Sequence, residues 1–469
     1  MVIIMNKEKI QKLQKPTHSY QNIDSIFIIS LSIILLFYLL SLSFGSDYKI
    51  NAQNQNQTIL GPSLTDPKLK VELVARDFDF PTSIEFLAKD DILLLEKNTG
   101  NVYRILNGNV TGPLIHIDVA QKDERGLLGI AVSENDSSNK EDTSVFLYYT
   151  QCTKAKDQDN KSSRNCGNYV YRYKFETENN TLTDPKLILS LPALPGPSHN
   201  GGVLELDKDK NLYVTVGDLQ PTKFIQNQSV FNTKSQNFIN GTAPDGRAGI
   251  LRITQDGNPV GHGILGNIYP LNLYYAYGIK NSFGIGFDPL TENLWDTENG
   301  PQFGDEINLV KPGFNSGWEK VQGIWKLNQT REKEGIFKES SKEVKFVNFN
   351  GKGKYSSPEF VWDKTVAPTA LIFLDSNKLG KKYKNDIFVG SAKNGRIFDF
   401  NLAKNRKSLS LSGNLTDLVF NKKDDPSKII FGEGFGIITD LEVGPDGYLY
   451  VVSGIRGTDE GSIYRIIPG

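Results

Sequence analysis

The 469-residue chain has few of the residues that build transition-metal centres, with two cysteines and four histidines. This scarcity argues against a zinc or copper site, since both metals prefer thiolate and imidazole ligands. The sequence also lacks a glycine-rich dinucleotide fingerprint between a strand and a helix, and it lacks a G-x-S-x-G elbow. A nicotinamide enzyme and a serine hydrolase are therefore not indicated. An excess of one charge is missing too, with 53 basic and 54 acidic residues, so no nucleic-acid partner is predicted.

Glycine and aromatic residues are plentiful, with 43 glycines, 26 phenylalanines and 19 tyrosines. Aromatic side chains favour strands, and glycine favours the tight turns between them. The composition therefore predicts many short strands rather than helices.

One long apolar segment lies near the N-terminus, where residues 26–44 contain no charged side chain. As a helix it would be roughly 28 Å long at about 1.5 Å per residue, close to the thickness of a bilayer core. Several lysines precede it, so the positive-inside rule predicts a cytoplasmic leader over residues 1–25, a transmembrane signal anchor over 26–44 and a cell-membrane protein whose remaining chain is extracellular. A cleaved signal peptide, which would give a secreted protein, is the alternative. Residues 45–69 are polar and rich in Asn and Gln, which predicts a flexible linker.

Cys152 and Cys166 bracket the polar segment TKAKDQDNKSSRN. In an oxidising compartment they could close this segment as a disulfide. Two free thiols are the alternative.

A repeated hairpin pattern runs through residues 70–469. The segments DDILLLEKNTGNVYRIL (90–106), NDIFVGSAKNGRIFDFNL (385–402) and DGYLYVVSGIRGTDEGSIYRII (446–467) share an apolar strand, a glycine-containing turn and an aromatic-rich strand. An alternating strand precedes each of six such units. Units of about four antiparallel strands bury both faces when they are arranged around an axis, so the pattern predicts an all-β, six-bladed β-propeller. A stack of unrelated sandwiches would not explain the repeat.

His199 lies in a Pro/Gly/Ser loop directly before the first strand of the third unit, and Asp218 ends a later strand of that unit. A strand that starts near the propeller axis can direct its neighbouring side chain into the central pocket. The pair therefore fits a general base whose imidazole is oriented by a carboxylate. A loop histidine that is hydrogen-bonded locally is the alternative.

The segment ENGPQFGDE (298–306) combines three carboxylates with one proline and two glycines. Such a loop places carboxylates and backbone carbonyls close together, which suits calcium. An acidic, solvated turn is the alternative.

Several of these segments resemble the glucose/sorbosone dehydrogenase family. They are GLLGIAV (126–132), SHNGGVLELDKDKNLYVTVGD (198–218), KNSFGIGFDP (280–289), ENGPQFGDEINLV (298–310), VAPTALIFL (366–374), SAKNGRIFDF (391–400) and TDLEVGPDGYLYVV (439–452). The resemblance covers roughly residues 70–468. It implies a soluble aldose dehydrogenase domain on a six-bladed propeller that depends on pyrroloquinoline quinone (PQQ).

The resemblance also implies roles for individual residues. His199 matches the base that takes a proton from the sugar's anomeric hydroxyl as hydride passes to the quinone, and Asp218 matches its partner. The calcium-binding positions fall on Gly300 and Pro301, through backbone carbonyls that hold the calcium at PQQ, and on Asp305 and Glu306 at a further, structural calcium site. Cofactor contacts fall on Asn281 and Lys393.

Other positions that match cofactor contacts depart from the family pattern. Lys280 stands where arginine is usual, and Glu124 stands where a glutamine contacts the cofactor. Ile437 and Thr439 replace an arginine pair that compensates the carboxylates of PQQ. Arg456 lies nearby in sequence and is a potential substitute.

We therefore expect a membrane-anchored, extracytoplasmic enzyme that oxidises aldose sugars to lactones with PQQ and calcium, and whose electron acceptor the sequence does not identify. A non-catalytic, calcium-stabilised propeller that binds a glycan or a protein is one alternative, supported by the missing arginines. A calcium-dependent lactonase-type hydrolase is another, because propellers also support that chemistry.

Overall fold

Short strands dominate the computed structural model, as the composition predicts. The structure describes residues 61–133, 143–152, 166–220, 237, 244–328, 330–339, 343–455, 457–458 and 460–469. The predicted leader, the anchor at 26–44 and most of the linker lie outside these residues. Among the described residues, no helix is both long and apolar enough to span a membrane.

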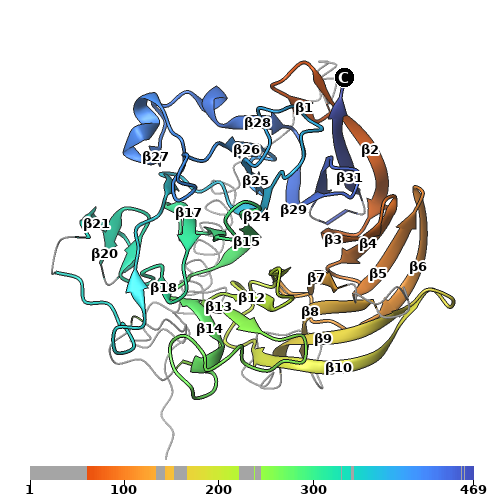
Figure 1. Ribbon diagram of the computed structural model, residues 1–469, viewed down its shortest axis with the longest axis horizontal. Helices are drawn as coiled ribbons and strands as arrows, with labels where there is room; N and C mark the ends of the chain where they lie inside the picture. Colours follow the sequence, from red (N-terminus) through yellow and green to blue (C-terminus); the bar gives the residue numbers. More distant parts are fainter. Residues whose placement is uncertain are drawn as a thin grey trace, which may run out of the picture. The chain divides into compact units, whose positions relative to one another are not determined.

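The first three sheets follow one another along the chain (Figure 1). Sheet 1 consists of β3 (Pro81–Ala88), β4 (Asp91–Glu96), β5 (Asn101–Leu106) and β6 (Asn109–His116). Sheet 2 consists of β7 (Leu127–Ser133), β8 (Ser144–Cys152), β9 (Cys166–Glu176) and β10 (Thr181–Pro192). Sheet 3 consists of β11 (Leu204–Leu206), β12 (Leu212–Val216), β13 (Gly249–Ile253), β14 (Tyr274–Tyr277), β18 (Phe314–Asn315) and β22 (Lys354–Tyr355).

The next three sheets complete the arrangement. Sheet 4 consists of β15 (Ser282–Phe287), β16 (Leu294–Glu298), β17 (Asp305–Val310), β23 (Phe360–Trp362) and β27 (Val419–Phe420). Sheet 5 consists of β24 (Pro368–Phe373), β25 (Ile387–Ser391), β26 (Ile397–Phe400), β28 (Ile430–Glu433) and β1 (Ser63–Leu64). Sheet 6 consists of β29 (Ile437–Val443), β30 (Leu449–Gly454), β31 (Gly461–Pro468) and β2 (Leu69–Phe78).

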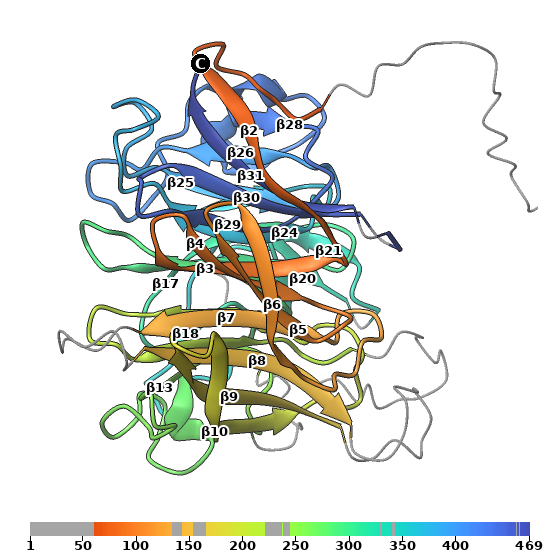
Figure 2. The same cartoon turned by 90° about the vertical axis from the view of Figure 1, so that its right-hand side faces the viewer.

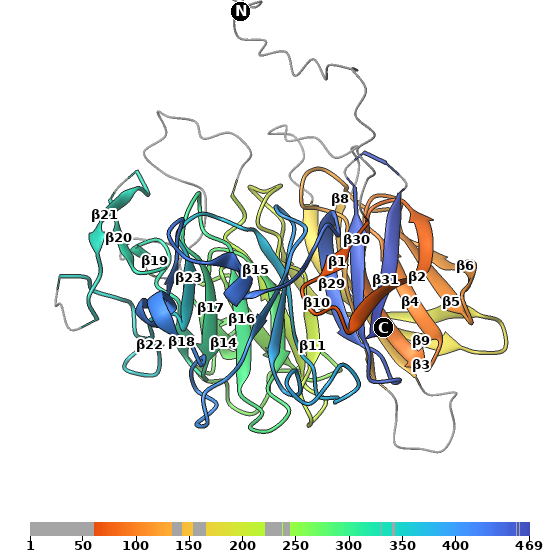
Figure 3. The same cartoon turned by 90° about the horizontal axis from the view of Figure 1, so that it is seen from above.

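Smaller elements lie between these sheets. A further sheet is formed by β19 (Val321–Gln322), β20 (Trp325–Leu327) and β21 (Lys333–Ile336), and it lies at one edge in Figure 3. Short 3-10 helices occur at η2 (Leu271–Leu273), η3 (Gly413–Asp417) and η4 (Pro426–Lys428). The prediction of an all-β fold is confirmed.

The predicted hairpin repeat appears as a repeated strand register. β4 pairs with β5 from Asp91↔Leu106, and β25 pairs with β26 from Ile387↔Phe400. β4 and β25, each the second strand of its sheet, are buried along their whole length, because neighbouring sheets cover both of their faces. The same antiparallel pairing recurs between β30 and β31, from Leu449↔Ile466.

The hydrophobic core is divided into six clusters, each between two neighbouring sheets. The clusters join sheets 1 and 2, 2 and 3, 3 and 4, 4 and 5, 5 and 6, and 6 and 1. The first strands β3, β7, β15, β24 and β29 contact neighbours around the centre of Figure 1, and β12 completes the contact between sheets 3 and 4. The six sheets therefore have a propeller-type arrangement.

Sheet 6 is built from the two ends of the described unit. β2 pairs with β31 from Leu69↔Pro468, and Figure 2 shows these strands side by side. In sheet 2, Cys152 and Cys166 are register partners and form a disulfide. Of the two alternatives for these cysteines, the structure therefore has the bonded one.

Candidate active site

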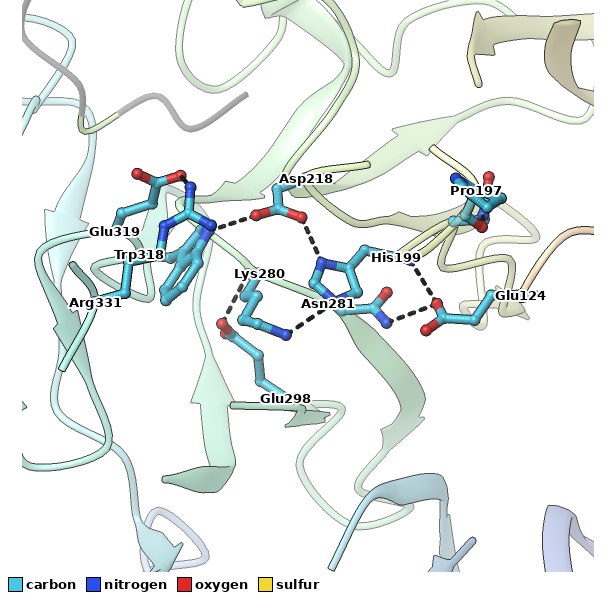
Figure 4. Close-up of polar contacts among 11 residues, drawn as sticks. Glu124, Pro197, His199, Asp218, Lys280, Asn281, Glu298, Trp318, Glu319 and Arg331 are labelled. Carbon is cyan, nitrogen blue, oxygen red and sulfur yellow. Dashed lines mark hydrogen bonds and ion pairs between the residues drawn. The ribbon is translucent and has the colours of Figure 1, made fainter. Parts of the chain in front are cut away.

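The site residues gather at the starting ends of the inner strands. Glu124 precedes β7, His199 precedes β11, and Lys280 and Asn281 precede β15. Because these strands begin their sheets near the axis, their preceding loops meet, and Figure 4 shows the resulting network. Glu124 and His199 are 75 positions apart in the sequence, yet they are in direct contact.

His199 and Asp218 form the predicted pair. The distance between His199 Nδ1 and Asp218 Oδ1 is 2.5 Å, and the two side chains are 12% and 0% exposed. Asp218 comes directly after Gly217 at the end of β12, and its backbone N–H donates to the Lys280 carbonyl at 2.9 Å. The prediction that these residues meet is confirmed, and the His199 imidazole is held by a buried carboxylate.

The electrostatics select one arrangement of protons. Burial acts to raise the pKa of Asp218, but the charge and hydrogen bond of His199 and the charges of Lys280 and Arg331 outweigh it, so the pKa is lowered. An ionised Asp218 accepts a hydrogen bond, so the neutral His199 imidazole carries its proton on Nδ1 and its lone pair on Nε2. Nε2 is therefore the atom of this imidazole that can accept a proton.

Lys280 lies on that side of the imidazole, with 3.1 Å between its Nζ and His199 Nε2. The lysine is 3% exposed. Burial lowers the pKa of Lys280, although Asp218, Glu124, Asp305 and Glu298 oppose the shift. Its backbone N–H donates to Glu298 Oε1 at 2.8 Å, which ties the site to the acidic loop.

Glu124 joins two loops of the site. Its Oε2 accepts the backbone N–H of His199 at 2.6 Å and the side-chain N–H of Asn281 at 3.2 Å. His199 has a positive φ of 63°, which is uncommon for a residue with a side chain, and the Glu124 contact fixes its backbone. In the structure, the residue predicted to contact the cofactor thus holds the histidine in place.

Gly217 allows the three loops to approach one another. A Cβ at this position would lie 2.4 Å from the His199 carbonyl oxygen and 2.8 Å from both Asn281 Oδ1 and the Lys280 carbonyl oxygen. Real Cβ contacts are longer than this, so the position requires glycine.

Trp318 belongs to the same network and was not predicted. Its indole Nε1–H donates to Asp218 Oδ2 at 2.8 Å. The signal in the sequence is a tryptophan in the turn FNSGW shortly after the acidic loop, but nothing in that pattern shows that its N–H faces a carboxylate 100 residues earlier.

The acidic loop is not a solvated turn. Glu298, Asp305 and Glu306 are at most 1% exposed. Asp305 accepts three backbone N–H groups, from Gly300 at 2.8 Å, Val366 at 2.7 Å and Ala367 at 2.8 Å. Burial raises the pKa of Asp305 despite these bonds. This carboxylate therefore fixes the loop that contains Gly300 and Pro301.

Glu306 and Glu298 are also tied to neighbouring groups. Gln322 donates to Glu306 Oε1 at 2.8 Å, and the backbone N–H of Gly323 donates to the same oxygen. Glu306 Oε2 has no hydrogen-bond partner among the described residues. Ser316 donates to Glu298. Burial raises the pKa of Glu306 to about 8 and that of Glu298 well above its usual value.

The loop has the donors that a hard cation needs. No hydrogen bond between described residues uses the carbonyl oxygens of Gly300 and Pro301. Asn281 Oδ1 is buried and has no hydrogen-bond partner among the described residues. Oxygen atoms of this kind suit calcium. Within the described part of the chain, no group of three or more His, Cys, Asp or Glu side chains is placed to hold a metal ion. The fit therefore rests on backbone carbonyls.

Three further predicted positions lie outside this network. Lys393 is exposed, its Nζ donates to Thr365 Oγ1 at 3.1 Å, and its backbone N–H donates to the Val366 carbonyl at 3.2 Å, next to the residues that bind Asp305. Ile437 and Thr439 lie on β29, where Thr439 Oγ1 donates to the Val452 carbonyl at 3.4 Å. Arg456 lies outside the described residues.

A cavity of about 760 Å³ lies at the opposite ends of the inner strands. We call it the axial cavity, and its lining includes Glu85 on β3, Glu205 on β11, Phe287 on β15, Phe373 on β24 and Glu442 on β29. The lining residues lie further along these strands, whereas His199 and Lys280 lie before the strands begin. The axial cavity is thus distinct from the His199 site.

Comparison with known proteins identifies the family. Residues 78–465 match the family profile described as Glucose / Sorbosone dehydrogenase. The chain is 24% identical over 406 residues to the aldose sugar dehydrogenase YliI of Escherichia coli (strain K12), covering 85% of this chain and 93% of that protein. It is 28% identical over 268 residues to quinoprotein glucose dehydrogenase B of Acinetobacter calcoaceticus, covering 54% of this chain and 52% of that protein.

Solved structures share the fold. The soluble aldose sugar dehydrogenase from Escherichia coli in the apo-form superposes with a TM-score of 0.63 at 20% identity, covering 86% of this chain and all (100%) of that one. The PQQ-bound form of aldose sugar dehydrogenase from Streptomyces coelicolor superposes with a TM-score of 0.55 at 20% identity, covering 87% of this chain and 100% of that one. Together with the family profile, which spans most of the chain, these findings show that the protein belongs to the glucose/sorbosone dehydrogenase family of oxidoreductases.

Proposed function

We propose that this protein is a PQQ- and calcium-dependent dehydrogenase that oxidises aldose sugars at the anomeric carbon to lactones. The observation that supports it most directly is the His199–Asp218 pair, in which the contact at Nδ1 leaves the lone pair of the imidazole on Nε2. The names of the relatives, which describe aldose and glucose dehydrogenases and a PQQ-bound form, agree with this chemistry.

The residues of this chain supply a base and fixed charges. His199 Nε2 takes the proton of the anomeric hydroxyl, and the ionised Asp218 stabilises the imidazolium that forms. Lys280, now 3.1 Å from Nε2, has to give up this contact before the base can act. Its ammonium group can then donate to an oxygen of the substrate or of the cofactor. The Nε2 lone pair, which accepted from Lys280 before, can then take the proton.

Residues of this network and of the acidic loop fit the cofactor at its metal end, and Lys393 would add a contact from outside the network. Lys280, Asn281 and Lys393 would hold the quinone, and the carbonyl oxygens of Gly300 and Pro301 would hold calcium. When bound, this group supplies the two-electron acceptor for the hydride of the anomeric carbon, with calcium as the Lewis acid. A carboxylate at Glu124 and uncharged side chains at Ile437 and Thr439 reduce the compensation for a tricarboxylate, so we expect weak cofactor binding.

We also propose that the enzyme works outside the cytoplasm. The apolar segment 26–44 and the Cys152–Cys166 disulfide support this placement, because disulfides persist in oxidising compartments. The propeller-type unit at residues 70–469 would then form the extracytoplasmic domain.

Titration of the purified protein with PQQ and calcium tests the proposal. Binding is followed by absorbance, and turnover is followed by dye reduction with aldoses. We expect micromolar PQQ binding and sugar-dependent reduction of the dye. We expect His199→Ala to lower turnover by at least about a hundredfold while PQQ still binds. Absence of PQQ binding would end the proposal, and unchanged turnover of His199→Ala would reject the base.

A non-catalytic propeller is the second candidate, favoured by the uncharged Ile437 and Thr439 on β29. It would bind calcium without PQQ. The titration distinguishes the two, since calcium would then raise the melting temperature while PQQ would not.

A further inference from the structure

Trp318 is a second hydrogen-bond donor to the carboxylate that orients the base. Its indole Nε1–H donates to Asp218 Oδ2 at 2.8 Å, while Asp218 Oδ1 lies 2.5 Å from His199 Nδ1. Each carboxylate oxygen therefore has its own partner, as Figure 4 shows. Asp218 cannot rotate about its side-chain bond without losing at least one of the two bonds.

The indole itself is held firmly. Trp318 is 1% exposed, its backbone N–H donates to the Gly278 carbonyl at 2.9 Å, and its carbonyl accepts the Asn237 side chain at 2.9 Å. These bonds fix the backbone of Trp318, and burial encloses its indole ring among neighbouring atoms.

The segment that separates β17 from β23 supplies a further support for the ring. The Arg331 guanidinium lies 5.3 Å from the centre of the Trp318 ring, and its Nη2 donates to Glu319 Oε1 at 2.7 Å. The Arg331 and Glu319 side chains are 5% and 7% exposed. A buried ion pair with this geometry holds the guanidinium against the indole.

Resting on the proposed function, we propose that Trp318 is a positioning residue: its N–H fixes the Asp218 carboxylate, which in turn holds the His199 imidazole with Nε2 available to the substrate. Glu319 and Arg331, which lie between β17 and β23, then support the active site, because their ion pair holds the guanidinium against the indole.

The charge balance at Asp218 agrees with this role. Its pKa is lowered although burial acts to raise it, because the charges of His199, Lys280 and Arg331 favour the ionised form. A hydrogen bond to an ionised carboxylate also favours that form, so losing the indole N–H raises the pKa.

The test uses the full chain without PQQ or sugar, labelled for NMR at aspartate, histidine and tryptophan. Trp318→Phe removes the N–H and keeps an aromatic ring, and Asp218→Asn and His199→Gln assign the resonances. We expect the midpoint of the Asp218 carboxyl to rise by about one pH unit, as the loss of one bond to a charged group implies. We expect the neutral His199 ring to change from the Nδ1–H tautomer to a mixture of both tautomers.

Trp325→Phe is the matched control. Its ring lies against Phe303 at 5.6 Å and against Lys333 Nζ at 3.5 Å, so the same substitution is made in the segment that contains Arg331. The proposal expects Trp325→Phe to leave the Asp218 midpoint and the His199 tautomer unchanged. Equal changes in both variants would overturn it.

A measurement on the unaltered protein keeps the test independent of how the variants fold. The indole proton of Trp318 should shift with pH along the titration curve of the Asp218 carboxyl group, which accepts its hydrogen bond. An indole resonance that does not follow this titration would overturn the proposal. None of these measurements needs sugar oxidation, so failure of the proposed function and failure of this inference give different results.

Discussion

The carboxylate of Glu124 accepts hydrogen bonds from two different loops, and this dual contact determines what its replacement should do. Glu124→Gln keeps an acceptor oxygen for the His199 and Asn281 N–H groups, whereas Glu124→Ala removes it. We expect the alanine variant to lower the free energy of unfolding by about 1–3 kcal/mol and the glutamine variant to change it by less than about 1 kcal/mol. Chemical denaturation measures both.

The same pair of variants tests the charge at this position. Removing a negative charge near a tricarboxylate favours its binding, so Glu124→Gln should bind PQQ more tightly than the unaltered protein by about tenfold. If both variants lost stability equally, the charge of Glu124 rather than its acceptor oxygen would hold His199.

At the scale of elements, Asp305 decides the shape of the acidic loop. Asp305→Asn would leave one oxygen for the N–H groups of Gly300, Val366 and Ala367, and it would turn an amide N–H₂ toward at least one of them. We expect the free energy of unfolding to fall by about 2–3 kcal/mol because a buried donor loses its partner. We also expect calcium to raise the melting temperature less than in the unaltered protein, since the Gly300 and Pro301 carbonyls are no longer fixed.

Asp425→Asn is the control for that variant. Asp425 is an exposed residue that caps η4 by accepting the Ser427 N–H at 3.0 Å. The same change of chemistry there should cost about 1 kcal/mol or less and leave the calcium response intact. An unchanged calcium response in Asp305→Asn would contradict the role of this loop.

At the scale of the whole molecule, the carboxylates of the axial cavity make stability depend on pH. Burial and the charge of Asp440 raise the pKa of Glu205 from 4.5 to about 8. Burial and the charge of Glu205 raise the pKa of Glu85 to about 8 as well. A group whose pKa is higher in the folded chain gives stability that is fully present below its unfolded pKa and is lost as the pH rises through its folded pKa.

We therefore expect the melting temperature to fall as the pH rises from 4.5 to about 8, the window that Glu205 defines. Glu205→Gln should flatten this fall, because its amide does not ionise. Glu178→Gln, at an exposed turn, should keep the full dependence. Calorimetry at several pH values measures the slopes, and equal slopes in the two variants would refute the contribution of the cavity.

Much of the fold follows from local pattern. The repeated hairpins predict sheets, because alternation and glycine turns act over a few residues, and the starts and ends of strands predict that His199 and Asp218 approach one another. The roles of Glu124 and Trp318 do not follow, because they depend on contacts across 75 and 100 residues. Loop conformation and close packing at Gly217 set these contacts, and neither has a periodic signal.

The pairing of β2 with β31 has a consequence for biosynthesis. β2 is made long before its sheet partner β31, so the strand LKVELVARDF has no ladder partner in sheet 6 until β31 has been synthesised. During that time its backbone groups form an unprotected edge, which is a hazard for association between nascent chains. The register Leu69↔Pro468 also brings two chain positions together that a short peptide could join. A circularly permuted gene that opens the chain at an exposed turn would let β31 and β2 emerge consecutively, as a hairpin.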